Sequence, residues 1–289
     1  MGLVFVACGP ADGGTDADHP APFEYDYVAH RPRGPLPHFS FFVTSLTGLF
    51  GLGDGPWGAA PDDQLGFGGN LGGLSGADAI CSALAQRGNP GDTKVWRAFL
   101  SSSEGHDRRI DAIDRIGRGP WFDHRGLKLA DNVAGLMPAD AADGRPSGAT
   151  PELAAMFTVE TGERVRSSTQ IDNHDVLTGS NRQGRLFDDG EEGRIATCDD
   201  WTSTSVRGTP GNGFGDGGQV PVGHSWPRSD FEGRNWIDEH SVNGCEPGVD
   251  TDGSAGAPRD NFTVGAAGGY GGFYCFALNA TTPTGSIVP

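Results

Sequence analysis

The chain has 289 residues, a formal net charge of −17 and 48 glycines, and hydrophobic residues make up 36% of it. So much glycine along the whole chain predicts a domain rich in irregular loops rather than a helical bundle. The negative charge disfavours nucleic acids and other polyanions as partners, because these need basic patches. No run approaches the roughly 18 apolar residues that span a bilayer, so we expect no integral membrane segment.

The first ten residues, MGLVFVACGP, are similar to the end of a bacterial lipoprotein signal. The similarity implies that residues 1–8 are a partial signal and that Cys8 carries a lipid, which would be the chain's membrane anchor. Phe5 and the lack of a basic residue before the apolar run depart from that pattern. We therefore expect a protein of the bacterial cell envelope, at the outer surface or in the periplasm, or a secreted one. The alternative is an ordinary apolar N-terminus with a free cysteine.

The segments beside the domain are polar. Residues 9–37 are rich in Pro, Gly, Asp and His without periodicity, which predicts a disordered tether. The domain is expected over residues 38–280, with a C-terminal tail at 281–289. Its first strand is predicted at 38–45, where HFSFFVTS concentrates aromatic and β-branched residues.

One helix is predicted over residues 76–87, in GADAICSALAQR. Ser75 followed by Asp78 resembles a capping box at the start of the helix. The sequence Gly-Asn-Pro from Gly88 onward predicts its end. Apolar residues recur at helical spacing around Cys81, so this cysteine is expected to face inward.

Further elements follow down the chain. A second helix is predicted at 106–117, where isoleucines recur every three residues. Strands are expected at 94–100, 175–178, 196–204, 220–226, 261–264 and 272–278.

Several short motifs occur in one order along the chain: GADAICSALA, WRAFLSSS, DVLTGSNRQGRLF, TCDDWTSTS, GHSW, NGC and FYCFAL. In this order they resemble endostatin-like domains of the C-type lectin-like fold, which also occur in bacterial surface proteins. The resemblance implies an α+β fold with a mixed, mostly antiparallel sheet, two helices, long Gly-rich loops and two disulfides. Residues near 139–172 and 205–260 match least and are interpreted as insertions.

Four cysteines lie within the domain, and the residues alone leave three pairings open. The resemblance implies that Cys81 pairs with Cys275 and Cys198 with Cys245. A zinc site built from all four is the alternative, although no pair has the short spacing that such sites prefer.

The metal sites of related domains match this sequence incompletely. Endostatins bind zinc through histidines near the start of the domain, where this chain has His38 alone. C-type lectins that bind sugar through calcium carry a Trp-Asn-Asp triplet, but here Ile237 stands between Trp236 and Asp238. Acidic loops remain as a possible calcium site, because calcium prefers six to eight oxygen ligands. The candidates are Asp188, Asp189, Glu191, Glu192, Asp250 and Asp252, and solvated loops are the alternative.

No motif of a known hydrolase, metalloprotease or nucleotide-binding protein is present. His106 with Asp107, and His174 with Asp175, are candidate acid–base pairs, although a histidine beside an aspartate in a loop is more often solvated. Trp226 and Trp236 fall within the Gly-rich segment and are candidate ligand-binding residues. The alternative is that each packs beneath its own loop.

We expect a non-catalytic binding or adhesion module that recognises an extracellular protein or glycan; bacterial proteins with this domain are associated with binding host or matrix proteins. The alternatives are a secreted metal-dependent hydrolase and a structural envelope protein. The sequence does not predict the oligomeric state.

Overall fold

The computed structural model describes residues 36–53, 65–103, 108–140, 143–166, 171–188, 196–205, 220–226, 234–251, 262–266 and 268–278. The chain divides into two compact units, residues 1–31 and residues 32–289. Every described residue belongs to the second unit, so Cys8, most of the predicted tether and the predicted C-terminal tail lie outside the described residues. Within the described residues, no helix has the length and apolar character needed to cross a membrane.

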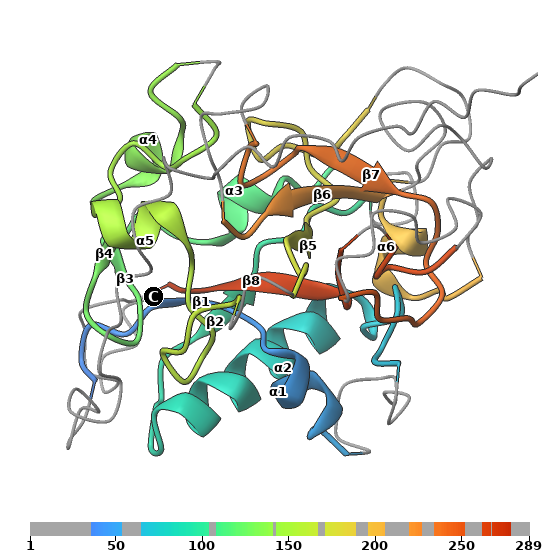
Figure 1. Ribbon diagram of the computed structural model, residues 1–289, viewed down its shortest axis with the longest axis horizontal. Coiled ribbons are helices and arrows are strands. Elements are labelled where there is room, and N and C mark those ends of the chain that lie inside the picture. The colour runs from blue at the N-terminus through green and yellow to red at the C-terminus, as the bar shows by residue number, and fades with distance from the viewer. Residues whose placement is uncertain are drawn as a thin grey trace, which may run out of the picture. The chain divides into compact units, whose positions relative to one another are not determined.

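A mixed sheet forms the centre of this unit (Figure 1). Its strands run in the order β1-β8-β5-β6-β7, and β2 also pairs with β8. Only the β5–β8 pair is parallel; the other described pairs are antiparallel. The strands are β1 (Phe41–Val43), β2 (Trp96–Ala98), β5 (Asp175–Leu177), β6 (Val220–His224), β7 (His240–Val242) and β8 (Gly272–Ala277), while β3 (Trp121–Phe122) and β4 (Lys128–Ala130) form a separate pair.

Strand β8 separates two apolar cores, because its successive side chains point to opposite faces. Phe273 and Cys275 belong to the core beneath helix α2 (Gly73–Gly88), which covers one face of the sheet (Figure 1). Tyr274 and Phe276 belong to the core on the other face. All six residues of β8 are buried, which explains why FYCFA reads as a continuous apolar run rather than an alternating one.

The predicted α+β class and mixed sheet are confirmed, but the expectation of two helices is wrong. The described residues contain six helices, of which only α2 is long. The other five span four or five residues, too few to show an apolar period in sequence. They are α1 (Leu46–Phe50), α3 (Ala112–Arg115), α4 (Val133–Leu136), α5 (Pro151–Ala155) and α6 (Cys198–Trp201).

The strand expected at 196–204 is replaced by α6. Its four residues have φ between 51° and 66°, in the left-handed region that side chains other than glycine rarely adopt. The side chain of Thr197 accepts a hydrogen bond from the Asp200 backbone N–H at 3.2 Å. The β-branched and aromatic residues here therefore form a tight turn instead of an extended segment.

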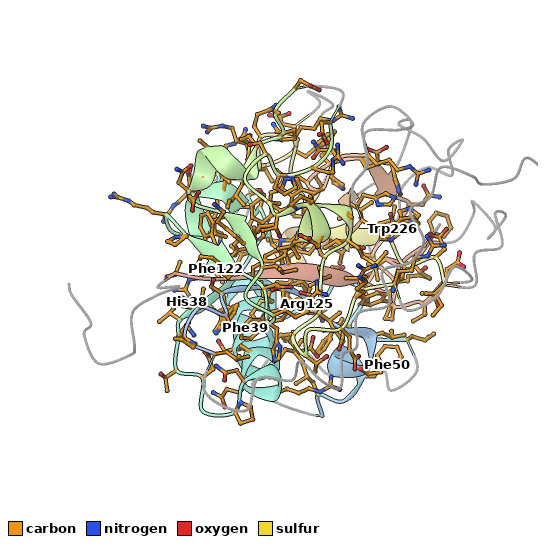
Figure 2. The ribbon with its side chains drawn as sticks, turned by 60° about the vertical axis from the view of Figure 1, so that its left-hand side comes forward. His38, Phe39, Phe50, Phe122, Arg125 and Trp226 are labelled. Atoms are coloured by element: carbon orange, nitrogen blue, oxygen red, sulfur yellow. A yellow bond between two sulfur atoms is a disulfide. The ribbon has the colours of Figure 1, made fainter. Side chains whose placement is uncertain are left out.

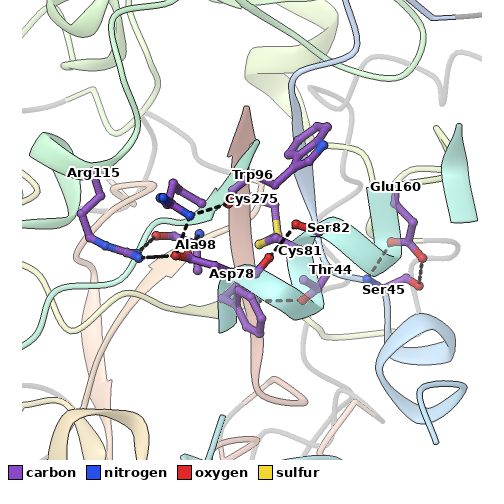
Figure 3. The surroundings of a disulfide bond; sticks show 12 residues. Thr44, Ser45, Asp78, Cys81, Ser82, Trp96, Ala98, Arg115, Glu160 and Cys275 are labelled. Atoms are coloured by element: carbon purple, nitrogen blue, oxygen red, sulfur yellow. Dashed lines mark hydrogen bonds and ion pairs between the residues drawn. A yellow bond between two sulfur atoms is a disulfide. The ribbon is translucent and has the colours of Figure 1, made fainter. Parts of the chain in front are cut away.

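Helix α2 begins at Gly73, two residues before the expected cap at Ser75. Asp78, expected to close a capping box, instead ties the helix to its neighbours (Figure 3). Its carboxylate accepts hydrogen bonds from the Ala98 backbone N–H at 2.9 Å and from the Arg115 guanidinium at 2.9 Å. One partly buried carboxylate thus joins α2, β2 and α3.

Both predicted disulfides are present. Cys81 of α2 is bonded to Cys275 of β8, with 5.6 Å between the Cα atoms (Figure 3). Cys198 is bonded to Cys245, with 5.7 Å between the Cα atoms. Because all four domain cysteines are paired, the alternative of a four-cysteine zinc site is excluded.

Glu160 is a fully buried carboxylate that anchors the start of α1 (Figure 3). It accepts hydrogen bonds from the Ser45 backbone N–H at 3.0 Å and from the Ser45 hydroxyl at 2.7 Å. Arg87, near the end of α2, donates to it at 3.0 Å. Burial raises the pKa of Glu160, and the Ser45 hydrogen bonds and the charge of Arg87 only partly offset that effect.

We predict that Glu160→Ala lowers the free energy of unfolding by about 2 kcal/mol, because it leaves buried donors of Ser45 without their acceptor. Urea denaturation measures the loss. Asp131→Ala is the matched control, since the Lys128–Asp131 ion pair is exposed and its loss should cost less than about 0.5 kcal/mol. Equal losses for the two variants would contradict the anchoring role of Glu160.

Candidate functional site

Three polar residues lie at one end of the sheet, where β5 begins, β6 ends and β7 begins. The antiparallel register pairs Asp175 of β5 with His224 of β6, and Val222 of β6 with His240 of β7. Directly paired residues point to the same face, as do residues two apart on one strand. The side chains of Asp175, His224 and His240 therefore share the face that carries Leu177 and Val222 in the α2-side core.

His174, Asp175 and His240 come together in a tight cluster. Nε2 of His240 lies 2.8 Å from Oδ1 of Asp175, and Nε2 of His174 lies 3.1 Å from the same oxygen. The two Nε2 atoms are 3.5 Å apart. All three side chains are nearly or fully withdrawn from solvent, with exposed fractions of 11%, 1% and 7%.

The second ring nitrogen of His174 is also engaged. Its Nδ1 lies 2.5 Å from Oδ1 of Asp172, whose side chain is about one-third exposed. Gly268 packs against this pair so closely that a Cβ atom there would lie 2.6 Å from Cε1 of His174. Asp172 and Gly268 thus fix the orientation of the imidazole.

His224 packs against the cluster. Its ring stacks on that of His174, with 4.4 Å between centroids and 19° between planes. Nη1 of Arg234 lies 2.9 Å from Nε2 of His224. Because a guanidinium only donates, Nε2 of His224 accepts this hydrogen bond and is not available to a ligand.

Charge within the cluster moves the pKa values in opposite directions. Burial would lower the pKa of His174, but the negative charges of Asp175 and Asp172 outweigh it and raise that pKa to about 10. The pKa of His240 is also raised, because Asp175 outweighs the opposing effect of burial. The pKa of Asp175 is lowered, since the two histidines outweigh its burial.

The predicted pairing of His174 with Asp175 is therefore found in space, and His240 joins it from a strand 65 residues further along the chain. Two imidazoles and a carboxylate can exchange protons, or they can bind a metal ion. Among the described residues, this is the one group of three or more potential metal-binding side chains. His106 and Asp107, the other predicted pair, lie outside the described residues.

The prediction that Trp236 is an exposed ligand-binding residue is wrong. Its side chain is fully buried against Phe99 and Tyr274, and its Nε1 donates to the Leu136 carbonyl at 2.8 Å. The preceding residue, Asn235, is held against β6, because its carbonyl accepts a hydrogen bond from the His224 backbone N–H at 2.9 Å. Trp236 belongs to the core opposite α2.

Trp226 is also buried, with 8% of its surface exposed. Its ring meets His224 edge-on at 4.6 Å between centroids, and the Arg166 guanidinium covers it at 4.4 Å. It lies apart from the group of His38, Phe39 and Phe122 near β1 (Figure 2). Trp226 therefore packs against the histidine cluster instead of presenting its ring to solvent.

Of the six predicted calcium ligands, the structure describes Asp188 and Asp250. Asp188 is exposed and Asp250 half-buried, and neither joins a group of three potential ligands within the described residues. Asp189, Glu191, Glu192 and Asp252 lie outside the described residues.

Sequence reasoning missed His240 as a partner of His174 and Asp175. Alternation in VPVGH places His224 on the face of Val220 and Val222, which is a readable signal. The position of His240 depends on the register between β6 and β7, which the sequence does not specify.

No protein-family model matches the chain, and no curated protein matches it.

We predict that Gly268→Ala disturbs the cluster, because its Cβ would press on the His174 ring. Gly126→Ala is the control, since Gly126 also has positive φ but has open space around its Cβ position. The control should lose about 1–2 kcal/mol of unfolding free energy from the backbone alone. Gly268→Ala should lose at least about 1 kcal/mol more through overpacking.

Urea denaturation measures both losses, and NMR of the imidazole nitrogens follows His174. Only Gly268→Ala should shift the His174 signals. Unchanged signals in that variant would show that Gly268 does not position the ring.

Proposed function

We propose that the chain is a non-catalytic binding module of the bacterial cell envelope, or a secreted one, that recognises an extracellular protein or glycan. We further propose that its scaffold is an endostatin-like domain of the C-type lectin-like fold. The α+β architecture, the mixed sheet and the pairing of Cys81 with Cys275 and Cys198 with Cys245 support this assignment.

The observation that carries the proposal is the disulfide-linked packing of the described residues that precede and follow the Gly-rich segments. The Cys198–Cys245 disulfide joins the two segments that flank residues 206–219 and 227–233. Residues 68–71 lie against it: the Gly69 backbone donates to the Cys245 carbonyl at 2.8 Å, and the Leu71 backbone donates to the Trp201 carbonyl at 2.9 Å.

Residues 68–71 pack closely against the Cys198–Cys245 disulfide. A Cβ on Gly69 would lie 2.3 Å from Sγ of Cys198, so only glycine fits where residues 68–71 pass the disulfide. Recognition residues are commonly carried by loops that a rigid scaffold positions. Because Trp226 and Trp236 are buried, we expect polar side chains and backbone groups of these loops, rather than tryptophans, to contact the ligand.

Two observations favour the other candidates. The burial of both tryptophans is what a structural envelope protein without a soluble ligand would show. The close approach of His174 to Asp175 is what a metal-dependent hydrolase would need. The binding module accounts better for this disulfide-linked packing, since neither alternative requires the residues beside the Gly-rich segments to be fixed there.

The test is a screen of the oxidised full-length chain against arrays of glycans and of extracellular-matrix proteins. A saturable partner at micromolar concentration is expected. No partner on either array, together with turnover of ester, peptide or glycoside substrates, would favour the hydrolase instead.

We predict that the Cys198–Cys245 disulfide mainly supports ligand binding, whereas the Cys81–Cys275 disulfide mainly supports stability. Cys198→Ser with Cys245→Ser should weaken binding to the partner found on the arrays by at least tenfold, because it frees the residues beside the Gly-rich segments. Cys81→Ser with Cys275→Ser is the matched control. It opens the longer loop, with a sequence separation of 194 rather than 47, and should cost about 1 kcal/mol more stability while leaving affinity unchanged.

Thermal melts and binding isotherms, both recorded where each variant is folded, separate the two effects. Full affinity in the Cys198/Cys245 variant would place the recognition surface elsewhere.

A further inference from the structure

We propose that His174, Asp175 and His240 bind a divalent first-row transition-metal ion, with zinc as the reference ion, through two imidazole Nε2 atoms and one carboxylate oxygen. This site goes beyond the proposed recognition function and stands or falls independently of it.

The first argument is the spacing of the three ligand atoms. Zinc lies about 2.0–2.2 Å from imidazole nitrogen and carboxylate oxygen, so neighbouring ligand atoms are separated by about 3.0–3.4 Å for bond angles of about 90–109°. The three separations here are 2.8, 3.1 and 3.5 Å. Shifts of a few tenths of an ångström would therefore place all three atoms around one ion.

The second argument is independent of spacing and concerns Asp175. Its side chain is 1% exposed, yet neither of its oxygens accepts a hydrogen bond of normal geometry from the described residues. The Nε2 atoms of His174 and His240 lie within ion-pair distance of Oδ1, without a hydrogen bond being formed to it. A buried carboxylate is costly without hydrogen-bonded or coordinated partners, and a metal ion would supply a coordinated one.

The surroundings match those of a metal-binding histidine. Such histidines usually donate their second ring nitrogen to a carboxylate or carbonyl, which fixes the ring and increases its basicity. Asp172 provides this contact to Nδ1 of His174 at 2.5 Å. His224 stacks on the face of the same ring, which restricts the tilt of the imidazole plane.

The ligand set selects the class of metal. Imidazole nitrogen suits zinc, copper, iron and nickel, whereas calcium and magnesium require oxygen ligands. Because His174 precedes β5 directly and His240 begins β7, an ion here would join the ends of two strands separated by β6. Three protein ligands leave a further coordination position.

Zinc binding to the metal-free, full-length chain tests the proposal. Calorimetric titration with zinc chloride should show one saturable site per chain, and calcium chloride should not compete. Asp172→Asn should weaken zinc binding by about 10- to 100-fold, as expected for a residue that only orients a ligand. His240→Ala should weaken it further than Asp172→Asn does.

His124→Gln is the matched control, because His124 is an equally buried histidine whose Nε2 lies 2.9 Å from the Gly88 carbonyl, away from the cluster. It should bind zinc with unchanged affinity. The proposal is overturned if the wild-type chain has no saturable site at micromolar zinc, or if His240→Ala binds as tightly as the wild type.

X-ray absorption of zinc bound to the wild-type chain gives a readout that does not depend on the folding of any variant. Two imidazoles with additional nitrogen or oxygen ligands and no sulfur are expected. A shell with sulfur, or with fewer than two imidazoles, would assign the ion to another place.

Discussion

The position of β8 is the constraint on which the rest of the fold depends. It is the last strand, yet it pairs with β1, β2 and β5 and separates the two cores. Every one of these contacts is long-range in sequence, and the Cys81–Cys275 disulfide adds a covalent link to α2 across 194 positions. The sheet therefore cannot be completed before the C-terminal segment is in place, and chains with such distant contacts form them at a large cost in loop-closure entropy.

The same constraint explains where polar groups are tolerated. Around β8 the sheet is covered on both faces by aromatic and aliphatic side chains, and all six residues of β8 are buried. Strands β5, β6 and β7 follow β8 in the order of the sheet, and one end of this group carries Asp175, His224 and His240 in place of apolar residues. The candidate site thus lies where the two-sided core ends.

Much of the fold could be predicted from the sequence, because its signals are local. The segments 38–45, 94–100, 175–178, 220–226 and 272–278 each contain a strand of the sheet. The strand expected at 196–204 failed because four consecutive residues are left-handed, and only Asp199 and Asp200 are of a type that enters this region readily. The burial of Trp236 was not predicted, because composition does not show which residues near a Gly-rich segment belong to the core.

The candidate site was half predictable for a similar reason. His174 and Asp175 are neighbours in sequence, so their association could be proposed. The contribution of His240 follows from strand register, and a slip of one residue between β6 and β7 would turn its side chain to the opposite face. Sequence patterns constrain register only through apolar alternation, and β7 has a single fully buried residue, Val242.

Burial of this cluster is difficult to explain by stability alone. Removing two imidazoles and a carboxylate from water carries a desolvation cost that their mutual attraction often fails to repay, and apolar replacements in other proteins are frequently as stable or more so. The neighbouring positions Leu177 and Val222 show that this face of the sheet accepts apolar side chains. The cluster nevertheless keeps charged groups beside these apolar residues. Asp172, His224 and Gly268 all contact the His174 imidazole and fix its orientation. Fixed nitrogen and oxygen atoms of this kind are what the proposed metal ion requires.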